Sequence, residues 1–157
     1  MKYADFMAFP FPQYELMAKQ GKLKMATGIC LDVYQTTSVP PYVKTLAEIL
    51  RDHKWFVDIL NDQPSAPHCF FGLQHPPLNA TASDIRLLKE AGIQFMTLAY
   101  EEENEYGGGF AAPDKPLTAK GEKIIKAMAE IGMTLDLSHA GHRTAREAIV
   151  FIRRQSL

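Results

Sequence analysis

Short apolar runs alternate with amphipathic stretches along most of the chain. The apolar runs cover 24–34, 68–74, 93–100 and 133–139 and contain few polar positions. Such runs are typical of strands that are buried on both faces of a parallel sheet. The stretches between them have the spacing of helices, so the pattern predicts repeated β/α units in an α/β fold. At 157 residues, one domain over 1–157 is expected.

Capping residues predict where two of the helices begin and end. Thr81 and Asp84 form a capping box before an apolar stretch, and Gly92 is placed to end that helix. Thr118 is expected to begin a second helix, which Gly132 would end with a left-handed residue.

Two further helices are predicted over 43–60 and 143–155. His53 lies in the first of them and is expected at a solvated position. The residues expected on the buried stripes of three helices are Val43, Leu46, Ile49, Leu50, Phe56, Leu60, Ile124, Ile125, Met128, Ile131, Ala145, Ile149 and Phe151 or Ile152.

Helices between parallel strands imply crossover connections, in either an open sheet or part of a barrel. Periodicity alone does not decide between these two arrangements. The stretch 101–116 is too polar and glycine-rich for regular structure and is predicted to be a long loop.

Charge and cysteine content narrow the classes of function. A net charge of -1 offers no basic surface for nucleic acid and no polybasic anchor for a membrane. Cys30 and Cys69 both lie in apolar runs, where buried free thiols are the expectation rather than a disulfide. The first 17 residues lack the pattern of a signal peptide or a membrane span. Together these features favour a cytoplasmic protein.

Polar residues follow several of the predicted strands, where ligands bind in parallel α/β folds. The glutamates among them are more simply explained as part of a solvated loop. His139 and His142 have the H-x-x-H spacing of a metal-binding pair, although a structural or exposed pair has the same spacing. These residues are Gln74, His75, Tyr100, Glu101, Glu102, Glu103, Asn104, Asp136, Ser138, His139 and His142.

The second half of the chain resembles a known enzyme family. The stretch from GIQFMTLAYEEENEYGGG to PLTAKGEKIIKAMAEIGMTLDLSHAGHRTAREAI is similar to the region of renal-dipeptidase-type (membrane dipeptidase) enzymes that runs from an L-T-H-N strand end to a D-L-S-H strand. The resemblance covers about 92–149 and extends more loosely upstream to about residue 70. It implies about five of the eight β/α units of a TIM-type barrel and a zinc-dependent hydrolase of dipeptides.

The resemblance assigns roles to four residues. His139 matches the D-L-S-H histidine that binds zinc in the family, and Tyr100 falls where the family has a substrate-contacting histidine. Asn104 is expected nearby at the mouth of a substrate pocket. Gln74 falls where the family has a glutamate that bridges two metals, and a neutral amide cannot supply that charge.

Other positions depart from the family pattern. Asp5 can be aligned with the start of the family's D-x-H-x-D, but Met7 and Phe9 then occupy ligand positions. The family's later histidine and aspartate ligands have no counterpart before Leu157. We therefore predict no cofactor for this chain, although the family uses zinc, with His139 and less strongly His142 as the metal candidates.

Three hypotheses remain open at this point. The first is a truncated dipeptidase-like chain that is inactive alone, the second a non-catalytic binding or assembly module, and the third an unrelated open-sheet domain. The expected ligand is a dipeptide-like molecule, with no nucleic acid or membrane partner. A partial barrel would leave apolar strand residues uncovered and favour a homo-oligomer. The candidates for that uncovered surface are Met25, Ile29, Leu31, Met133 and Leu135.

Overall fold

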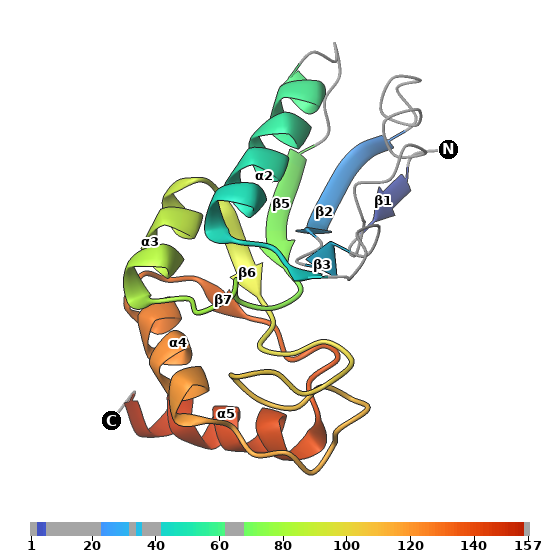
Figure 1. Ribbon diagram of the computed structural model, residues 1–157. Coiled ribbons are helices and arrows are strands. Elements are labelled where there is room, and N and C mark those ends of the chain that lie inside the picture. The colour runs from blue at the N-terminus through green and yellow to red at the C-terminus, as the bar shows by residue number, and fades with distance from the viewer. Residues whose placement is uncertain (1–2, 6–22, 32–33, 36–41, 62–67, 156–157) are drawn as a thin grey trace.

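A parallel five-stranded sheet organises the chain in a computed structural model that describes residues 3–5, 23–31, 34–35, 42–61 and 68–155 (Figure 1). The strand order is β1-β2-β5-β6-β7, and every pair is parallel. A mixed α/β fold with a parallel sheet is thus confirmed. The strands are β1 Tyr3–Asp5, β2 Leu23–Leu31, β5 His68–Leu73, β6 Ile93–Met96 and β7 Thr134–Leu135. A separate antiparallel pair contains β3 Tyr34–Gln35 and β4 Tyr42–Val43.

Four helices alternate with the later strands. They are α2 Leu46–Asn61, α3 Ala82–Glu90, α4 Ala119–Glu130 and α5 His142–Gln155. Figure 1 shows α2, α3 and α4 one after another along the same side of the sheet. None of the helices in the described part of the chain is long and apolar enough to span a membrane.

The predicted caps of α3 and α4 are confirmed. The Thr81 hydroxyl accepts a hydrogen bond from the Asp84 amide, and the Asp84 carboxylate accepts one from the Thr81 amide at 2.7 Å. Thr118 caps α4 by accepting from the Gly121 amide at 3.0 Å. Gly92 and Gly132 follow the two helices with φ values of 108° and 65°, the left-handed backbone that favours glycine.

The core lies between the helices and one face of the sheet. The expected stripe residues Ile49, Phe56, Ile124, Ile125 and Met128 are buried in it. Val43, Leu46, Leu50 and Ile131 pack against its margin. The Leu60 side chain lies outside the described residues, as do the side chains of Met25, Ile29, Cys30, Leu31 and Cys69.

The strands are shorter than the apolar runs predicted. The runs 93–100 and 133–139 contain strand only over Ile93–Met96 and Thr134–Leu135. Beyond them the chain turns, because local groups take over the backbone hydrogen bonds. The Leu98 carbonyl accepts from the Asn104 side chain at 2.8 Å, and the Ser138 amide donates to the Asp136 carboxylate at 2.8 Å.

The prediction that His53 is solvated was wrong. Its side chain is 6% exposed, and its ring lies edge-on to Phe71 with the ring centroids 4.5 Å apart. The Nε2 atom is buried without a hydrogen-bond partner. His53 faces β5 because it lies four residues after Ile49, on the stripe that α2 turns to the sheet.

Two predictions about apolar residues were also wrong. Ile149 was expected to face inward but is 39% exposed, and Thr144 and Ala148 instead form the buried face of α5. Met133 was a candidate for uncovered surface but is buried, whereas Leu135 is partly buried against the core. Met133 is held inward because its amide donates to the Met128 carbonyl at 2.9 Å.

Burial of His53 predicts that acid destabilises the fold. Burial lowers the pKa of His53 below its ordinary value of 6.5, because a charged imidazolium is poorly solvated there. Below about pH 6.5 the unfolded chain binds a proton at His53 that the folded chain does not, so the free energy of unfolding falls as pH drops. Above that pH this contribution to stability is fully present. Urea unfolding from pH 7.5 down to pH 5 measures the slope.

A matched pair of variants isolates this effect. His53→Leu should flatten the pH dependence, whereas His142→Gln, which removes an exposed imidazole, should leave it unchanged. An equally steep loss of stability in His53→Leu would show that another group is responsible.

Candidate binding site at the carboxyl edge of the sheet

The register of three neighbouring strands aligns one row of side chains at their carboxyl ends. Leu73, Met96 and Leu135 are paired across β5, β6 and β7, and all three contribute to the core on the helix side. Because side chains alternate along a strand, the residues that follow should point to the opposite face. Those residues are Gln74, Thr97 and Asp136, and two backbone hydrogen bonds of 3.0 Å, from Thr97 to Leu73 and from Asp136 to Met96, hold them in register.

Aromatic side chains lie below this polar row. A Cβ atom at Gly72 would come within 2.1 Å of the Phe95 ring, so glycine allows that ring to lie directly on β5. Phe70, two residues before Gly72, is exposed. The face of the sheet opposite the helices is therefore apolar along the strands and polar at their carboxyl ends.

The polar row is largely buried. Gln74 is 6% exposed and Thr97 is 3% exposed. The Thr97 hydroxyl makes no hydrogen bond within the described residues, which is costly for a buried polar group. Asp136 is half-buried, and one of its carboxylate oxygens accepts from the Ser138 amide. A hydroxyl, an amide and a carboxylate with spare hydrogen-bonding capacity can recognise a small polar ligand.

His139 lies at the rim of the same edge, among aromatic rings. Tyr100 stacks on it with the ring centroids 4.2 Å apart and an interplanar angle of 24°, and the Phe110 ring is 5.8 Å away. Tyr100 follows β6 and His139 follows β7, so the structure brings these two predicted site residues together. His139 has a φ of 62°, which turns its side chain away from the direction of β7.

Three glycines allow the loop after β6 to close over the start of α5. A Cβ atom at Gly107 would lie 2.6 Å from the Thr144 side chain, and one at Gly109 would lie 2.4 Å from the Glu101 carbonyl. The Gly108 amide donates to the Thr144 hydroxyl, and the Gly141 amide donates to the Gly108 carbonyl at 2.7 Å. This contact holds the segment that carries His139 against the loop that carries Phe110.

Asn104 holds the turn of that loop. Its side-chain amide donates to the Leu98 carbonyl at 2.8 Å, and its oxygen accepts from the amides of Tyr106 and Gly107 at 2.8 and 3.1 Å. These bonds engage both ends of the side chain. Asn104 therefore shapes the site by fixing the loop, and its predicted contact with a substrate stays a prediction.

Tyr106 joins the loops that follow β5 and β6. Its hydroxyl donates to the Pro77 carbonyl and accepts from the Ala80 amide, both at 2.8 Å. Burial raises the pKa of Tyr106, so the hydroxyl keeps its proton. Beside it, partial burial opposes ionisation of Glu105, but hydrogen bonds from Lys120 and from the Asn79 amide outweigh this effect and lower its pKa.

The described residues do not fit a metal centre. They contain no group of three or more His, Cys, Asp and Glu side chains placed to hold an ion. His139 has aromatic neighbours, Glu103 pairs with Lys115 at 2.7 Å, and His142 is exposed on the first turn of α5. Gln74 makes no hydrogen bond to either histidine within the described part of the chain. Asp5 is described in its backbone only, and positions 7 and 9 lie outside the described residues.

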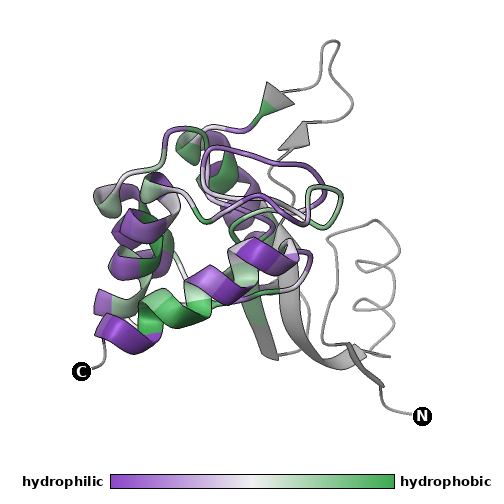
Figure 2. Ribbon diagram, turned by 90° about the horizontal axis from the view of Figure 1, so that it is seen from below, coloured by the Kyte–Doolittle hydropathy of each residue, from purple (hydrophilic) through white to green (hydrophobic). Residues whose placement is uncertain are grey.

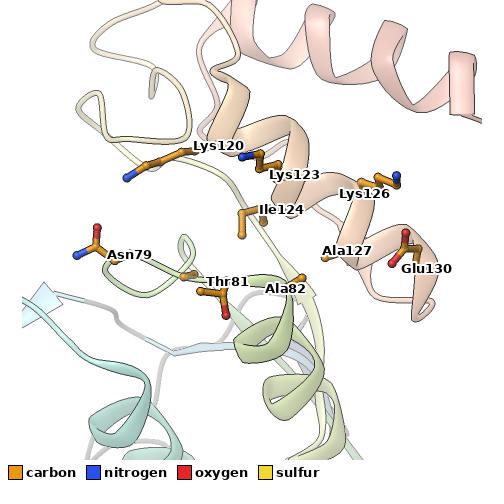
Figure 3. Close-up of a pocket in the computed structure, with 10 residues that line it drawn as sticks. Asn79, Thr81, Ala82, Lys120, Lys123, Ile124, Lys126, Ala127 and Glu130 are labelled. Atoms are coloured by element: carbon orange, nitrogen blue, oxygen red, sulfur yellow. The ribbon is translucent and has the colours of Figure 1, made fainter.

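A concave surface lies elsewhere, between the start of α3 and α4 (Figure 3). This groove of about 540 Å³ has Ala82, Ile124 and Ala127 on its apolar side, with Lys120, Lys123 and Lys126 along α4. It contains none of the predicted site residues. Lys120 is engaged by Glu105, and the start of α3 is already capped by Asp84.

Sequence reasoning missed Thr97, Phe110 and the three glycines as parts of this edge. Thr97 could have been found by counting from Met96, because an apolar strand residue that faces the core places its neighbour on the other face. No sequence signal identifies Phe110, since its contact with His139 depends on how a 16-residue stretch, 101–116, folds back.

Comparisons with known proteins agree with the resemblance. The family model "Membrane dipeptidase (Peptidase family M19)" matches residues 69–153. Dipeptidase aclJ of Aspergillus oryzae is 34% identical over 73 residues, which are 44% of this chain and 17% of that protein. Dipeptidase 3 of Rattus norvegicus is 28% identical over 89 residues, 52% of this chain and 18% of that protein. The matched stretches thus span less than a fifth of these relatives.

A solved structure shares the fold over a longer range. The amidohydrolase from Pseudomonas aeruginosa superposes with a TM-score of 0.67 and 19% identity. The superposition covers 96% of this chain and 50% of the amidohydrolase. The arrangement of strands and helices described above is therefore found within a chain about twice as long.

Removing the Asn104 side chain should destabilise the fold. Asn104→Ala deletes three hydrogen bonds to loop backbone, each of which contributes about 1 kcal/mol. The expected loss is roughly 3 kcal/mol, measured by urea unfolding. Glu102→Ala, at an exposed position of the same loop, is the control and should have little effect. An unchanged free energy of unfolding in Asn104→Ala would mean that the loop is held by its other contacts.

The purified chain should hold no zinc after dialysis. One histidine among aromatic rings lacks the carboxylate and imidazole companions that tight binding requires. Metal analysis by mass spectrometry gives the stoichiometry. One tightly bound zinc per chain would contradict the expectation, and its loss in His139→Gln and His142→Gln would then identify the ligands.

Proposed function

The chain belongs to the membrane dipeptidase family, peptidase family M19, and on that premise we propose that its carboxyl edge binds a dipeptide-like molecule without hydrolysing it. The observation that carries the proposal is the environment of His139. The rings of Tyr100 and Phe110 contact this histidine, and within the described residues it belongs to no cluster of three or more potential metal ligands. The rim of this edge therefore presents aromatic rings at the place where hydrolysis of a dipeptide would need charged groups.

The polar row supports binding of a dipeptide. A dipeptide carries an ammonium group, an amide and a carboxylate, and each needs hydrogen-bond partners when it leaves water. The Asp136 carboxylate suits the ammonium group, and Gln74 and the Thr97 hydroxyl can donate to the carboxylate. All three side chains belong to one row, which spans three strands that are each about 5 Å apart.

The aromatic rim favours an apolar side chain on the ligand. Tyr100 and Phe110 present ring surface at the open end of the edge, and an aromatic pair contributes about 1 kcal/mol beyond the burial of area. A dipeptide with an aromatic side chain should therefore bind more tightly than one with a methyl group.

Hydrolysis would need a nucleophile that the described residues do not supply. In the enzymes that this chain resembles the attacking group is a hydroxide that zinc supplies, and no described side chain is placed to act in its stead. The described residues contain no serine or cysteine aligned with a histidine and a carboxylate at this edge. We therefore assign Tyr100, Gln74 and Thr97 to binding and assign no catalytic residue.

The fold contributes to the proposal as a part of a barrel. Five parallel strands with helices along one side would correspond to about five of the eight β/α units of a barrel, and the greater length of the superposed amidohydrolase is compatible with this view. The exposed Phe70 and the half-buried Phe95 lie on the face that a closed barrel would enclose. A role in assembly is a second function, which the exposure of Phe70 favours.

Calorimetric titration with L-alanyl-L-phenylalanine and with L-alanyl-D-alanine tests the binding. The aromatic dipeptide should bind more tightly, and Tyr100→Ala should weaken its binding by roughly fivefold, the equivalent of about 1 kcal/mol. Trp55→Ala, which removes an exposed ring from α2, should leave binding unchanged. Neither dipeptide should be cleaved when zinc is added, as measured by release of free amino acids.

Two results would contradict the proposal. Equal dipeptide affinities of the wild type and Tyr100→Ala would show that the aromatic rim is not part of the binding site. Zinc-dependent cleavage, in the wild type or in Gln74→Glu, would show that residues outside this description complete a metal centre.

A further inference from the structure

The groove between the start of α3 and α4 combines an apolar floor with a cationic wall (Figure 3). One isoleucine and three alanines form the floor: Ile124, Ala80, Ala82 and Ala127. The wall consists of Lys120, Lys123 and Lys126, which follow one another along α4 at intervals of three residues and therefore lie on neighbouring turns. With a volume of about 540 Å³, the groove has the size of a site for a small molecule.

Consecutive units of the fold form this groove. α3 packs against α4, and α4 also packs against α5. The strand β6 follows α3, and β7 follows α4. All the residues that line the groove belong to the described part of the chain. The groove is therefore a feature of two adjoining helices and not an unfinished edge of the sheet.

The segment that lines the α3 side of the groove is held in place by contacts within the fold. The Glu105 carboxylate accepts a hydrogen bond from the Asn79 amide at 2.8 Å and pairs with Lys120. The Tyr106 hydroxyl accepts a hydrogen bond from the Ala80 amide at 2.8 Å. This side of the groove is thus positioned before any ligand arrives, which lowers the cost of ordering it on binding.

Lys123 and Lys126 keep their ammonium groups available. Both side chains are exposed, and neither forms an ion pair or a hydrogen bond within the described residues. The other lysines with described side chains are engaged by an acidic residue or a carbonyl group, and these are Lys44, Lys54, Lys89, Lys115 and Lys120. Glu130, the acidic residue of the groove lining, lies 3.8 Å from the guanidinium of Arg86. The groove therefore carries local positive charge, although the whole chain has a net charge of -1.

A neighbouring groove between α4 and α5 lacks this charge pattern. It has a volume of about 350 Å³, and its lining includes Ile125, Phe151 and Ile152. Figure 2 shows the second half of α5 as an apolar segment before its hydrophilic end. The two charged side chains of this lining, Lys126 and Glu130, have opposite signs. Of the two grooves, the one at the start of α3 is thus the one in which positive charge exceeds negative charge beside apolar surface.

We propose that the groove between α3 and α4 binds a small amphipathic anion, a molecule with one anionic group on an apolar body. The apolar body lies against Ile124 and Ala127, and the anionic group lies beside the ammonium groups of Lys123 and Lys126. Burial of the apolar body supplies most of the affinity, and the two lysines select the charge. This site is separate from the carboxyl edge of the sheet, and the inference does not rest on dipeptide binding there.

Titration with octanoate, followed by the amide NMR signals of the isotope-labelled chain, tests the proposal. Octanoate should shift the amide signals of Ile124 and Ala127 on α4 and of Ala82 across the groove. Octan-1-ol has a similar apolar body without the charge and should bind roughly fivefold more weakly. Butyrate has the same charge on a shorter body and should bind roughly tenfold more weakly.

Variants of the two walls separate the lysines from a general effect of charge. The double variant Lys123→Gln/Lys126→Gln should weaken octanoate binding roughly fivefold. Ala82→Glu should also weaken it, because it places a carboxylate on the opposite wall, at a first-turn position where a helix accepts negative charge. Lys54→Gln removes an exposed lysine of α2 outside the groove and should leave the affinity unchanged. Circular dichroism verifies that each variant is folded.

Four results would overturn the proposal. Octanoate might shift only amides outside the groove, or bind the double variant as tightly as the wild type. Equal affinities for octanoate and octan-1-ol would show that the lysines do not select the charge. Inorganic phosphate that produces the same shifts at the same concentration as octanoate would show that a bare anion is sufficient and that the apolar floor takes no part.

Discussion

The parallel register of β5, β6 and β7 is the constraint on which both faces of the sheet depend. It places Leu73, Met96 and Leu135 in one row, which the helices bury. The same register places Gln74, Thr97 and Asp136 in the next row on the opposite face. A slip of one residue in β6 would exchange Met96 and Thr97, so that an apolar side chain would enter the polar row and a hydroxyl the core. The core and the candidate binding edge are thus specified by the same backbone hydrogen bonds.

The loops after the strands form the parts of the candidate site that strand register does not determine. Tyr106 joins the loop after β5 to the loop after β6, and the contact of Gly108 with Thr144 joins the latter to α5. These contacts close the loop that carries Phe110 against the segment that carries His139. The aromatic rim is therefore a product of tertiary contacts between loops, whereas the polar row below it is a product of the sheet.

Local sequence signals were enough to predict those parts of the fold that depend only on neighbouring residues. The capping box of Thr81 and Asp84 and the left-handed Gly92 were predicted because each depends on a few adjacent residues. The burial of His53 and Ile149 was predicted wrongly, because it depends on contacts with distant parts of the chain. A histidine on an apolar stripe becomes buried only if a strand lies under it, and the burial of an apolar helix residue likewise depends on which element packs on its face. Of the candidate site, Gln74, Tyr100 and His139 could be named from strand ends, but the stacking of Tyr100 on His139 could not.

We propose that His139 packs against aromatic rings and not in a metal centre, and the proton NMR signal of its Cε1–H tests this directly. A ring stacked at 4.2 Å should move this signal upfield, and the shift should disappear in Tyr100→Ala. Addition of equimolar zinc should leave the signal in place. A signal at the ordinary position of a solvated histidine, or one that shifts or broadens with equimolar zinc, would contradict the account.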